Sequence, residues 1–297
     1  MLIQWFPGHM TKALRMMEKE LKVVDVIVYV LDSRAPFSCV NPKLNNFVEN
    51  KPVIYVFNKT DLADEKKVEG WMKYFSNKGK CIKLNSVQSG TAKKIENTIL
   101  ELMKDKINRK KEKNINAFIR GIVIGVPNCG KSTIINNLCN KGKTQTGNKP
   151  GVTRGKQWVK LNSGIEMMDT PGTLWPAFDN SYVAQHLAYI GSIRDEVLDI
   201  PELSIEFIKE MTIMYPSVLE EKYKIKIDGD SPLEILEKIC KSRGYMLKGA
   251  EYDYDRASMA IINDFRKGKL GQITVEDVSQ IKKLTIKDRK KVAEKID

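Results

Sequence analysis

Short apolar runs, many of them rich in β-branched residues, alternate with longer polar segments in the first half of the chain. The runs of strand length are residues 23–31, 52–57, 81–84, 118–124, 157–161 and 165–168. Several are apolar at almost every position, which is typical of strands buried on both faces of a mainly parallel sheet. The last two runs are separated by a polar turn at residues 162–164 and are predicted to form a hairpin.

The segments between these runs carry apolar residues at helical spacing. This spacing predicts helices over residues 12–22, 41–50, 64–78, 91–113 and 133–138, with Thr11 as the N-cap of the first. Strands that alternate with helices predict an α/β fold, here a mixed, mostly parallel sheet flanked by helices.

Beyond residue 175 the hydrophobic pattern is helical throughout. Pro201, Pro216 and Pro232 divide it into short helices, and no residue there has the type and spacing of a catalytic group. His186 is predicted to be structural. The chain of 297 residues is long enough for two cores, so we expect an α/β domain over residues 1–175 and a smaller all-α domain over residues 176–297.

The composition excludes several classes of protein. The best apolar run, residues 23–31, is too short to span a bilayer and contains Asp25, and the N-terminus lacks the pattern of a cleaved leader. The five cysteines are scattered without a Cys-x-x-Cys pair, which argues against a zinc site and for a reducing compartment. We therefore expect a cytoplasmic protein with no membrane partner.

The net charge of +13 is unevenly distributed. Residues 1–175 and 266–297 are strongly basic, whereas residues 176–265 are net negative. A basic surface of this size favours a large polyanion such as RNA as the partner, although solvated lysines alone would give the same count. The basic stretch over residues 104–113 is a candidate RNA contact, although a solvated helix end would have the same composition.

One stretch has a specific chemical pattern. Residues 125–132, Gly-Val-Pro-Asn-Cys-Gly-Lys-Ser, match the phosphate-binding P-loop and lie between a predicted strand and a predicted helix. In this pattern the glycines let backbone N–H groups converge on phosphate, the lysine reaches the β- and γ-phosphates, and the serine binds Mg²⁺. The expected nucleotide contacts here are Pro127, Asn128, Cys129, Gly130, Lys131, Ser132 and Thr133.

Two loops that follow earlier strands are suited to reading a guanine base. Asn58-Lys59-Thr60-Asp61 directly follows a buried run, and a carboxylate at Asp61 can accept the two adjacent N–H donors that guanine has and adenine lacks. Asn58 is expected to tie loops together, and the stem of Lys59 to lie along the base. The small-residue loop that begins Asn85-Ser86-Val87 is expected to offer N–H groups to the guanine oxygen.

Two further segments have the residues of a γ-phosphate sensor. Thr153 lies in a Gly/Thr/Asn-rich loop that can close over Mg²⁺ when a γ-phosphate is present. Asp169 ends a predicted strand and leads to Gly172. Asp169 is expected to hold Mg²⁺ through water, together with Ser132 and Thr153, and the Gly172 N–H to contact the γ-phosphate.

Together these loops resemble the five G-boxes of the Ras-like GTPase superfamily, but the base-reading loops come first in the chain. This order predicts a circularly permuted Ras-like P-loop G domain, which the topology tolerates because the loops still meet at one edge of the sheet. Three further motifs resemble those of the YlqF/RbgA family of bacterial ribosome-assembly GTPases. They are Trp-Phe-Pro-Gly-His-Met at residues 5–10, Asp-Ser-Arg-Ala-Pro at residues 32–36 and Asp-Thr-Pro-Gly-Thr-Leu-Trp-Pro at residues 169–176.

The resemblance implies a GTPase with GTP or GDP and Mg²⁺ as ligands and a slow intrinsic rate stimulated by the ribosomal particle. It also implies a helical C-terminal RNA-binding domain and a large ribosomal subunit precursor, with its rRNA, as the partner. GTP would favour binding to the precursor, and hydrolysis would release the protein. A monomer is expected, and no DNA partner.

The position of the water-orienting glutamine of Ras is Thr173 here, so the missing element must come from elsewhere. The family resemblance points to His9, and Asn128 matches an asparagine that K⁺-activated GTPases use as a ligand. The expected catalytic set is therefore His9, Lys131, Thr153 and Gly172, with K⁺ at Asn128 as an alternative supplier of charge.

Other functions stay open on the residues alone. One is a nucleotide-gated RNA-binding module whose hydrolysis is incidental, and another is a signalling GTPase with protein partners. The basic surface argues against the second. An ATP-directed P-loop enzyme is disfavoured by Asp61.

Overall fold

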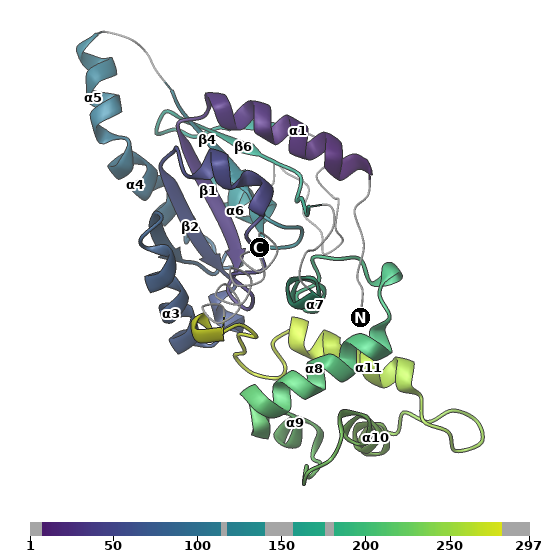
Figure 1. Ribbon diagram of the computed structural model, residues 1–297. Coiled ribbons are helices and arrows are strands. Elements are labelled where there is room, and N and C mark those ends of the chain that lie inside the picture. The colour runs from purple at the N-terminus through teal and green to yellow at the C-terminus, as the bar shows by residue number, and fades with distance from the viewer. Residues whose placement is uncertain (1–7, 114–117, 140–156, 176–180, 281–297) are drawn as a thin grey trace, which may run out of the picture.

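The computed structural model describes residues 8–113, 118–139, 157–175 and 181–280 (Figure 1). The first half of the chain forms one six-stranded sheet with the order β3-β2-β1-β4-β6-β5. The strands are β1 (Val26–Asp32), β2 (Val53–Asn58), β3 (Lys80–Lys83), β4 (Ile119–Ile124), β5 (Gln157–Lys160) and β6 (Ile165–Asp169).

Every predicted strand is present within a few residues of its expected bounds. All residues of β1 and β2 are buried, as expected for strands covered on both faces. Strands β1 to β4 and β6 pair in parallel, and only β5 runs antiparallel, as the hairpin partner of β6. The mixed, mostly parallel sheet is therefore confirmed.

The sheet also shows how the reordered chain is accommodated. Strand β4, which leads into the P-loop, lies between β1 and β6. The strands that lead into the Asn58 and Asn85 loops, β2 and β3, continue the sheet beyond β1. Because β1, β2, β3, β4 and β6 are parallel, their carboxyl ends lie at one edge of the sheet. The loops therefore meet there although their order along the chain is permuted.

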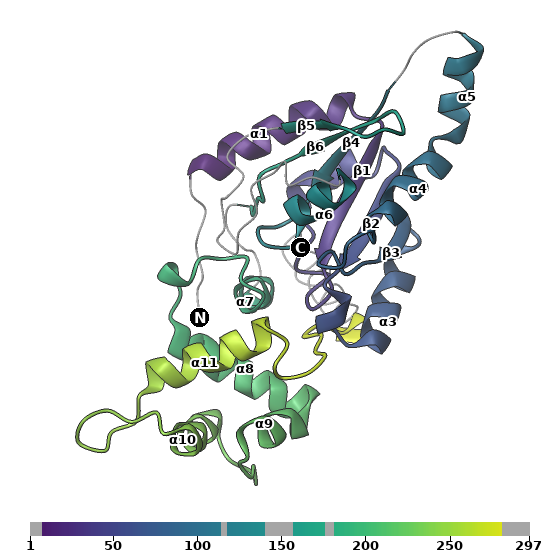
Figure 2. The ribbon, with the colours of Figure 1, turned by 180° about the vertical axis from the view of Figure 1, so that it is seen from behind.

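The helices of this half are α1 (Gly8–Val23), α2 (Asn45–Val48), α3 (Glu65–Phe75), α4 (Lys93–Leu102), α5 (Lys104–Glu112) and α6 (Lys131–Leu138), with short 3-10 turns η1 (Pro42–Leu44) and η2 (Thr60–Leu62). Helix α1 contacts α2 and β4, and α6 packs on β6 on the other side of the sheet (Figures 1 and 2). Leu14, Met17 and Leu21 form the buried stripe of α1.

Two predicted helix boundaries were wrong. Thr11 lies inside α1, which already includes Gly8, so it is not the N-cap. The helix predicted over residues 91–113 breaks at Met103, a buried residue whose backbone leaves the helical region before α5 begins. The apolar stripe weakens beyond that point, and α5 has no buried residue, so its pattern did not reveal the change of direction.

The second half is helical, as predicted. It contains α7 (Ser181–Tyr189), η3 (Asp195–Val197), α8 (Ile200–Met214), α9 (Pro216–Tyr223), α10 (Pro232–Arg243) and α11 (Tyr254–Arg266). Helix α8 packs against the other four α-helices of this half (Figure 1). Tyr189, Phe207 and Phe265 form a chain of ring contacts in this core. A capping box at Ser231 begins α10.

After α11 the chain returns to the first half of the molecule. The Ile273 and Val275 N–H groups donate to the carbonyls of Leu62 and Arg34. The buried carboxylate of Glu276 accepts hydrogen bonds from the backbone N–H groups of Phe37 and Ser38. The returning segment that follows α11 therefore packs against residues 34–62 of the first half of the chain, and Ile273, Val275 and Glu276 are buried there.

His186 lies where these parts meet. Its ring is fully buried, with Nδ1 3.1 Å from Glu276 Oε1 and Nε2 3.0 Å from Glu210 Oε2. The predicted structural role of His186 fits this position, because it joins α7, α8 and the returning segment.

All five cysteines are free thiols. Within the described ranges, no helix combines the length and apolar character needed to cross a bilayer.

Candidate nucleotide-binding site

The P-loop follows β4 and ends at the first turn of α6. Gly125 and Gly130 have φ values of 153° and 102°, which favour glycine. A Cβ at Gly130 would lie 2.2 Å from Asn58 Nδ2, and one at Gly125 would lie 2.5 Å from the Val30 carbonyl oxygen. The loop is therefore both curled and closely packed, so its N–H groups and the N-terminus of α6 form a cradle suited to an anion.

Lys131 lies inside this cradle. Its side chain is buried, and Nζ donates to the Val126 carbonyl oxygen over 2.8 Å. Gly172 approaches from the loop after β6, where an added Cβ would lie 2.6 Å from Pro127 Cα and 2.9 Å from Lys131 Nζ. The structure thus brings the lysine and the glycine of two predicted phosphate-contacting loops to the same point.

Ser132 and Asp169 meet beside the lysine. Ser132 Oγ donates to Asp169 Oδ2 over 3.0 Å. Burial raises the pKa of the Asp169 carboxyl above its ordinary value, although Lys131 and the Ser132 hydroxyl act in the opposite direction. Asp169 Oδ1 is buried without a hydrogen-bond partner among the described residues. A hydroxyl beside a carboxylate with an unsatisfied oxygen fits a hydrated Mg²⁺ ion.

Asn58 ties the base-side loops to the P-loop, as predicted. Its Nδ2 donates to the Cys129 carbonyl oxygen over 2.8 Å and to Ser86 Oγ over 3.0 Å. Its Oδ1 accepts from the Ser86 backbone N–H over 3.0 Å. One buried amide therefore fixes three predicted nucleotide-binding loops relative to one another.

The residues expected to contact the base lie at the surface of this edge. Asp61 is exposed and lies in η2. This turn begins directly after Lys59, whose φ of 60° turns the chain sharply at the end of β2. Asn85 Oδ1 accepts the Val87 N–H, and Val87 is 83% exposed. This open position is suited to a base that enters from solvent.

The sequence reasoning missed the partner of Lys59. Lys59 Nζ lies 2.8 Å from Asp32 Oδ2, and the same carboxylate forms a two-pronged ion pair with Arg34. The sequence contained a signal for this contact, because Asp32 and Arg34 lie at the end of one buried strand and Lys59 at the end of another. The two strands, β1 and β2, pair in the sheet, with Asp32 opposite Asn58. We interpreted that segment only as a loop and as a family motif.

The sequence reasoning also missed a contact between the helical region and the P-loop. Asn128, with a φ of 60°, donates from Nδ2 to the Gly191 carbonyl oxygen over 2.6 Å. Ser192 Oγ donates to the Pro127 carbonyl oxygen over 2.8 Å. The turn after α7 therefore rests directly on the phosphate-binding loop.

Two of the predicted catalytic residues, Thr153 and His9, are not brought to the site by described contacts. Thr153 lies outside the described residues. His9 is in the first turn of α1 rather than in a turn before it, and its side chain is outside the description. Thr173, in the position of the missing glutamine, is buried with 2% of its surface exposed.

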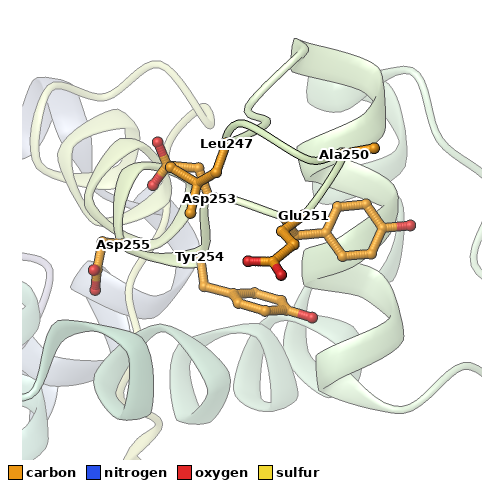
Figure 3. A pocket seen from close by; sticks show the side chains of 7 residues that line it. Leu247, Ala250, Glu251, Asp253, Tyr254 and Asp255 are labelled. Atoms are coloured by element: carbon orange, nitrogen blue, oxygen red, sulfur yellow. The ribbon is translucent and has the colours of Figure 1, made fainter.

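A surface pocket of about 500 Å³ lies elsewhere, between α10 and α11 (Figure 3). Its lining includes the acidic residues Glu251, Asp253 and Asp255. Asp253 is engaged as the N-cap of α11. These carboxylates would repel phosphate, so the pocket does not compete with the P-loop as the nucleotide site.

The fold and the loops define the class of the protein, a P-loop GTP hydrolase. A family model described as a 50S ribosome-binding GTPase matches residues 120–216. Ribosome biogenesis GTPase A of Bacillus cereus is 38% identical over 278 residues, covering 93% of this chain and 94% of that protein. The protein of the same name from Thermotoga maritima is 30% identical over 275 residues, which cover 92% of this chain and 94% of that protein. The chain therefore belongs to the ribosome biogenesis GTPase A family, also called YlqF/RbgA, as its motifs suggested.

Solved structures agree with this assignment. A GDP-bound structure of TM YlqF has a TM-score of 0.65 and 26% identity, covering 89% of this chain and all of that one. A GNP-bound YlqF from T. maritima has a TM-score of 0.61 and 26% identity, with 90% and 98% covered. The protein is thus a guanine-nucleotide-binding GTPase of ribosome assembly, and the predicted fold class and enzyme class are confirmed.

Proposed function

We propose that GTP favours binding of this protein to a large ribosomal subunit precursor and that hydrolysis couples late assembly to its release. The observation that carries this proposal is the contact between the P-loop and the helical region, at Asn128–Gly191 and Pro127–Ser192. A change at the γ-phosphate reaches the helical region through these two hydrogen bonds without a long intervening path. The family membership supplies the ribosomal setting.

An rRNA contact is supported by α5. Its nine residues include five lysines and arginines, none is buried, and the helix extends away from the sheet (Figure 1). Lys106 is paired with Asp25, which leaves most of the positive charge of α5 facing solvent. Exposed cations on a projecting helix suit phosphate contacts, which set affinity and orientation rather than base sequence.

For the chemistry, we assign roles to residues that the structure brings together. Lys131 would exchange its contact with the Val126 carbonyl for the β- and γ-phosphates, and the Gly172 N–H would donate to the γ-phosphate. Ser132 and Asp169 would hold Mg²⁺, with Thr153 as a further ligand. When bound, Mg²⁺ neutralises phosphate charge. Asp61 would accept the guanine N–H donors.

The water-orienting element is proposed to come from His9 or from K⁺. Asn128 donates through its amide nitrogen to the Gly191 carbonyl oxygen. In the K⁺ alternative, the ligand would be the side-chain oxygen of Asn128. Replacing His9 with alanine should abolish particle-stimulated turnover while leaving GDP affinity intact. Turnover in Na⁺ equal to that in K⁺ would eliminate the cation alternative.

The decisive experiment is sedimentation with large subunits and their precursors, using a non-hydrolysable GTP analogue, GDP or no nucleotide at two salt concentrations. We expect the analogue to favour co-sedimentation with precursors. Equal or absent binding in all three states would refute the switch. A variant with Lys110 and Lys111 of α5 changed to glutamate should bind less, whereas the same changes at Lys66 and Lys73 of α3 give a control of identical net charge.

The same assay distinguishes the alternatives. An RNA-binding module with incidental hydrolysis would support assembly even when hydrolysis is blocked and binding is kept. A signalling GTPase would bind neither subunit nor precursor. For an assembly switch, we expect the protein to stay on the particle when hydrolysis is blocked. Precursors should accumulate at the same time.

A further inference from the structure

Asp32 is a buried carboxylate shared by two cations. Oδ1 accepts from the Arg34 backbone N–H over 3.1 Å and from Arg34 Nε over 2.9 Å. Oδ2 lies 2.7 Å from Arg34 Nη2 and 2.8 Å from Lys59 Nζ. Burial alone would raise the pKa of this carboxyl, but the charges of Arg34 and Lys59 hold it well below its usual range. Asp32 is therefore charged throughout the physiological pH range.

The sheet explains why Asp32 and Lys59 meet. In the parallel pairing of β1 with β2, Asp32 lies opposite Asn58, the last residue of β2. Lys59 follows in the left-handed conformation, and its side chain is 23% exposed. The Asp32 carboxylate thus fixes the amine of the lysine whose stem is assigned to the guanine base.

Arg34 connects the same carboxylate to the helical region. Arg34 is 1% exposed. Its guanidinium lies 5.2 Å from the ring centroid of Phe265 and donates from Nη1 to the Arg266 carbonyl oxygen over 3.1 Å. Phe265 and Arg266 are the last residues of α11. Every nitrogen of the Arg34 guanidinium is therefore engaged, two with Asp32 and one with α11.

The connection continues to the P-loop. The side chain of Arg266 donates to the carbonyl oxygens of Ala188 and Tyr189 at the end of α7, and it pairs with Asp195. Gly191, in the turn after α7, accepts the hydrogen bond from Asn128. A chain of polar contacts thus joins the base-side lysine and the phosphate-side asparagine through α11 and α7.

We propose that Asp32 and Arg34 are positioning residues for guanine-nucleotide binding: Asp32 holds Lys59 under the base, and Arg34 makes that arrangement depend on the docking of α11. This inference rests on the proposed role of Lys59 in the nucleotide site. Its consequence is reciprocal, because an interaction that moves α11 must change nucleotide affinity to the same degree that nucleotide changes that interaction.

The test is a double-mutant cycle read by equilibrium binding of fluorescent mant-GDP to the full chain. Lys59→Met keeps the apolar stem but removes the amine that Asp32 holds. Asp32→Asn keeps the shape but removes the charge. Each should weaken mant-GDP binding roughly tenfold, the effect of losing a hydrogen bond to a charged group. The double variant should be no weaker than either single one, because both remove the same contact.

Arg34→Gln tests the connection to α11. It should weaken mant-GDP binding severalfold in the natural background and have no effect in the Lys59→Met background. This variant also keeps the test open where Asp32→Asn does not fold, since it leaves the carboxylate and Lys59 in place. Glu276→Gln is the matched control, a buried carboxylate that also joins the helical part to the sheet but does not contact Lys59. It should change mant-GDP affinity much less than Arg34→Gln does.

The outcomes separate this inference from the proposed function. Loss of mant-GDP affinity in Lys59→Met with none in Asp32→Asn would overturn the positioning role and leave the GTPase site intact. Additive losses, or an equal loss in Glu276→Gln, would mean a general structural effect and would likewise overturn it. An unmodified protein that binds mant-ADP as tightly as mant-GDP would overturn the guanine site itself, and the inference with it.

Discussion

His186 offers a quantitative test of how the helical part is held to the sheet. Burial alone would lower the pKa of its ring, but hydrogen bonds and charges from Glu210 and Glu276 raise it to about 9 from an ordinary value of 6.5. Glu276 is itself fully buried and joins the returning segment to Ser38. The protonated imidazole is therefore the cation that two carboxylates share at this junction.

The magnitude follows from the difference between the two pKa values. At about 1.4 kcal/mol for each pH unit, it corresponds to about 3 kcal/mol of stability, of the order expected for breaking a buried ion pair. Because the folded pKa is the higher one, this stabilisation is fully present below pH 6.5 and is lost as the pH rises through about 9.

The perturbation is His186→Gln, which keeps hydrogen-bonding capacity but removes the charge. We expect it to lower the free energy of unfolding by about 3 kcal/mol at pH 7 and by much less at pH 10, where the natural protein has lost the same charge. Urea unfolding followed by tryptophan fluorescence measures both values. Other groups that change charge between pH 7 and pH 10 are present in both proteins, so their effects cancel in the comparison.

Glu210→Gln provides the control, because Glu210 is partly exposed and its loss leaves the buried pair with Glu276 in place. It should cost less stability and keep part of the pH dependence. Parallel stability curves for the natural protein and His186→Gln between pH 7 and pH 10 would refute the reasoning.

Three further predictions concern the nucleotide site. Gly172→Ala places a Cβ 2.6 Å from Pro127 Cα, so GTP hydrolysis should fall at least about a hundredfold in a phosphate-release assay, with GDP affinity less affected. Ser132→Ala removes the hydroxyl beside Asp169, so chelation of Mg²⁺ should no longer weaken GDP binding, as titration with and without EDTA would detect. Asp61→Asn should lower GDP affinity at least about a hundredfold and raise affinity for xanthosine diphosphate, which presents an acceptor where guanine has a donor.

The sheet and the phosphate-binding segments could be predicted because their signals are local. Runs apolar at every position, such as residues 26–31, fit buried parallel strands. The P-loop pattern contains glycines at two of its three positions of positive φ, the third being Asn128. The position of Asn58 between three loops was also accessible, since a polar residue directly after a buried strand must find partners at the sheet edge.

The contacts that join the helical region to the site could not be predicted in the same way. Asn128 and Gly191 are far apart in the chain, as are Arg34 and Arg266, and no periodic pattern marks such pairs. The same holds for Glu276, which accepts hydrogen bonds from Phe37 and Ser38, more than 200 residues earlier. These contacts depend on the packing of two bodies, which the hydrophobic pattern of either one does not specify.

This arrangement also bears on how strong a nucleotide-dependent switch the molecule can be. The helical region is attached to the P-loop at Asn128, to the base-side lysine through Arg34, and to a site away from the nucleotide at Glu276. If nucleotide alters only the first two, the third keeps the helical region docked, and the response is a shift in orientation rather than detachment. The net contribution of one hydrogen bond to stability is about 1 kcal/mol. The two nucleotide-side contacts together therefore supply about 2 kcal/mol of coupling free energy. That corresponds to roughly a thirtyfold change in affinity for a partner that binds both bodies, which is enough for GTP and GDP states to differ in occupancy of a ribosomal particle.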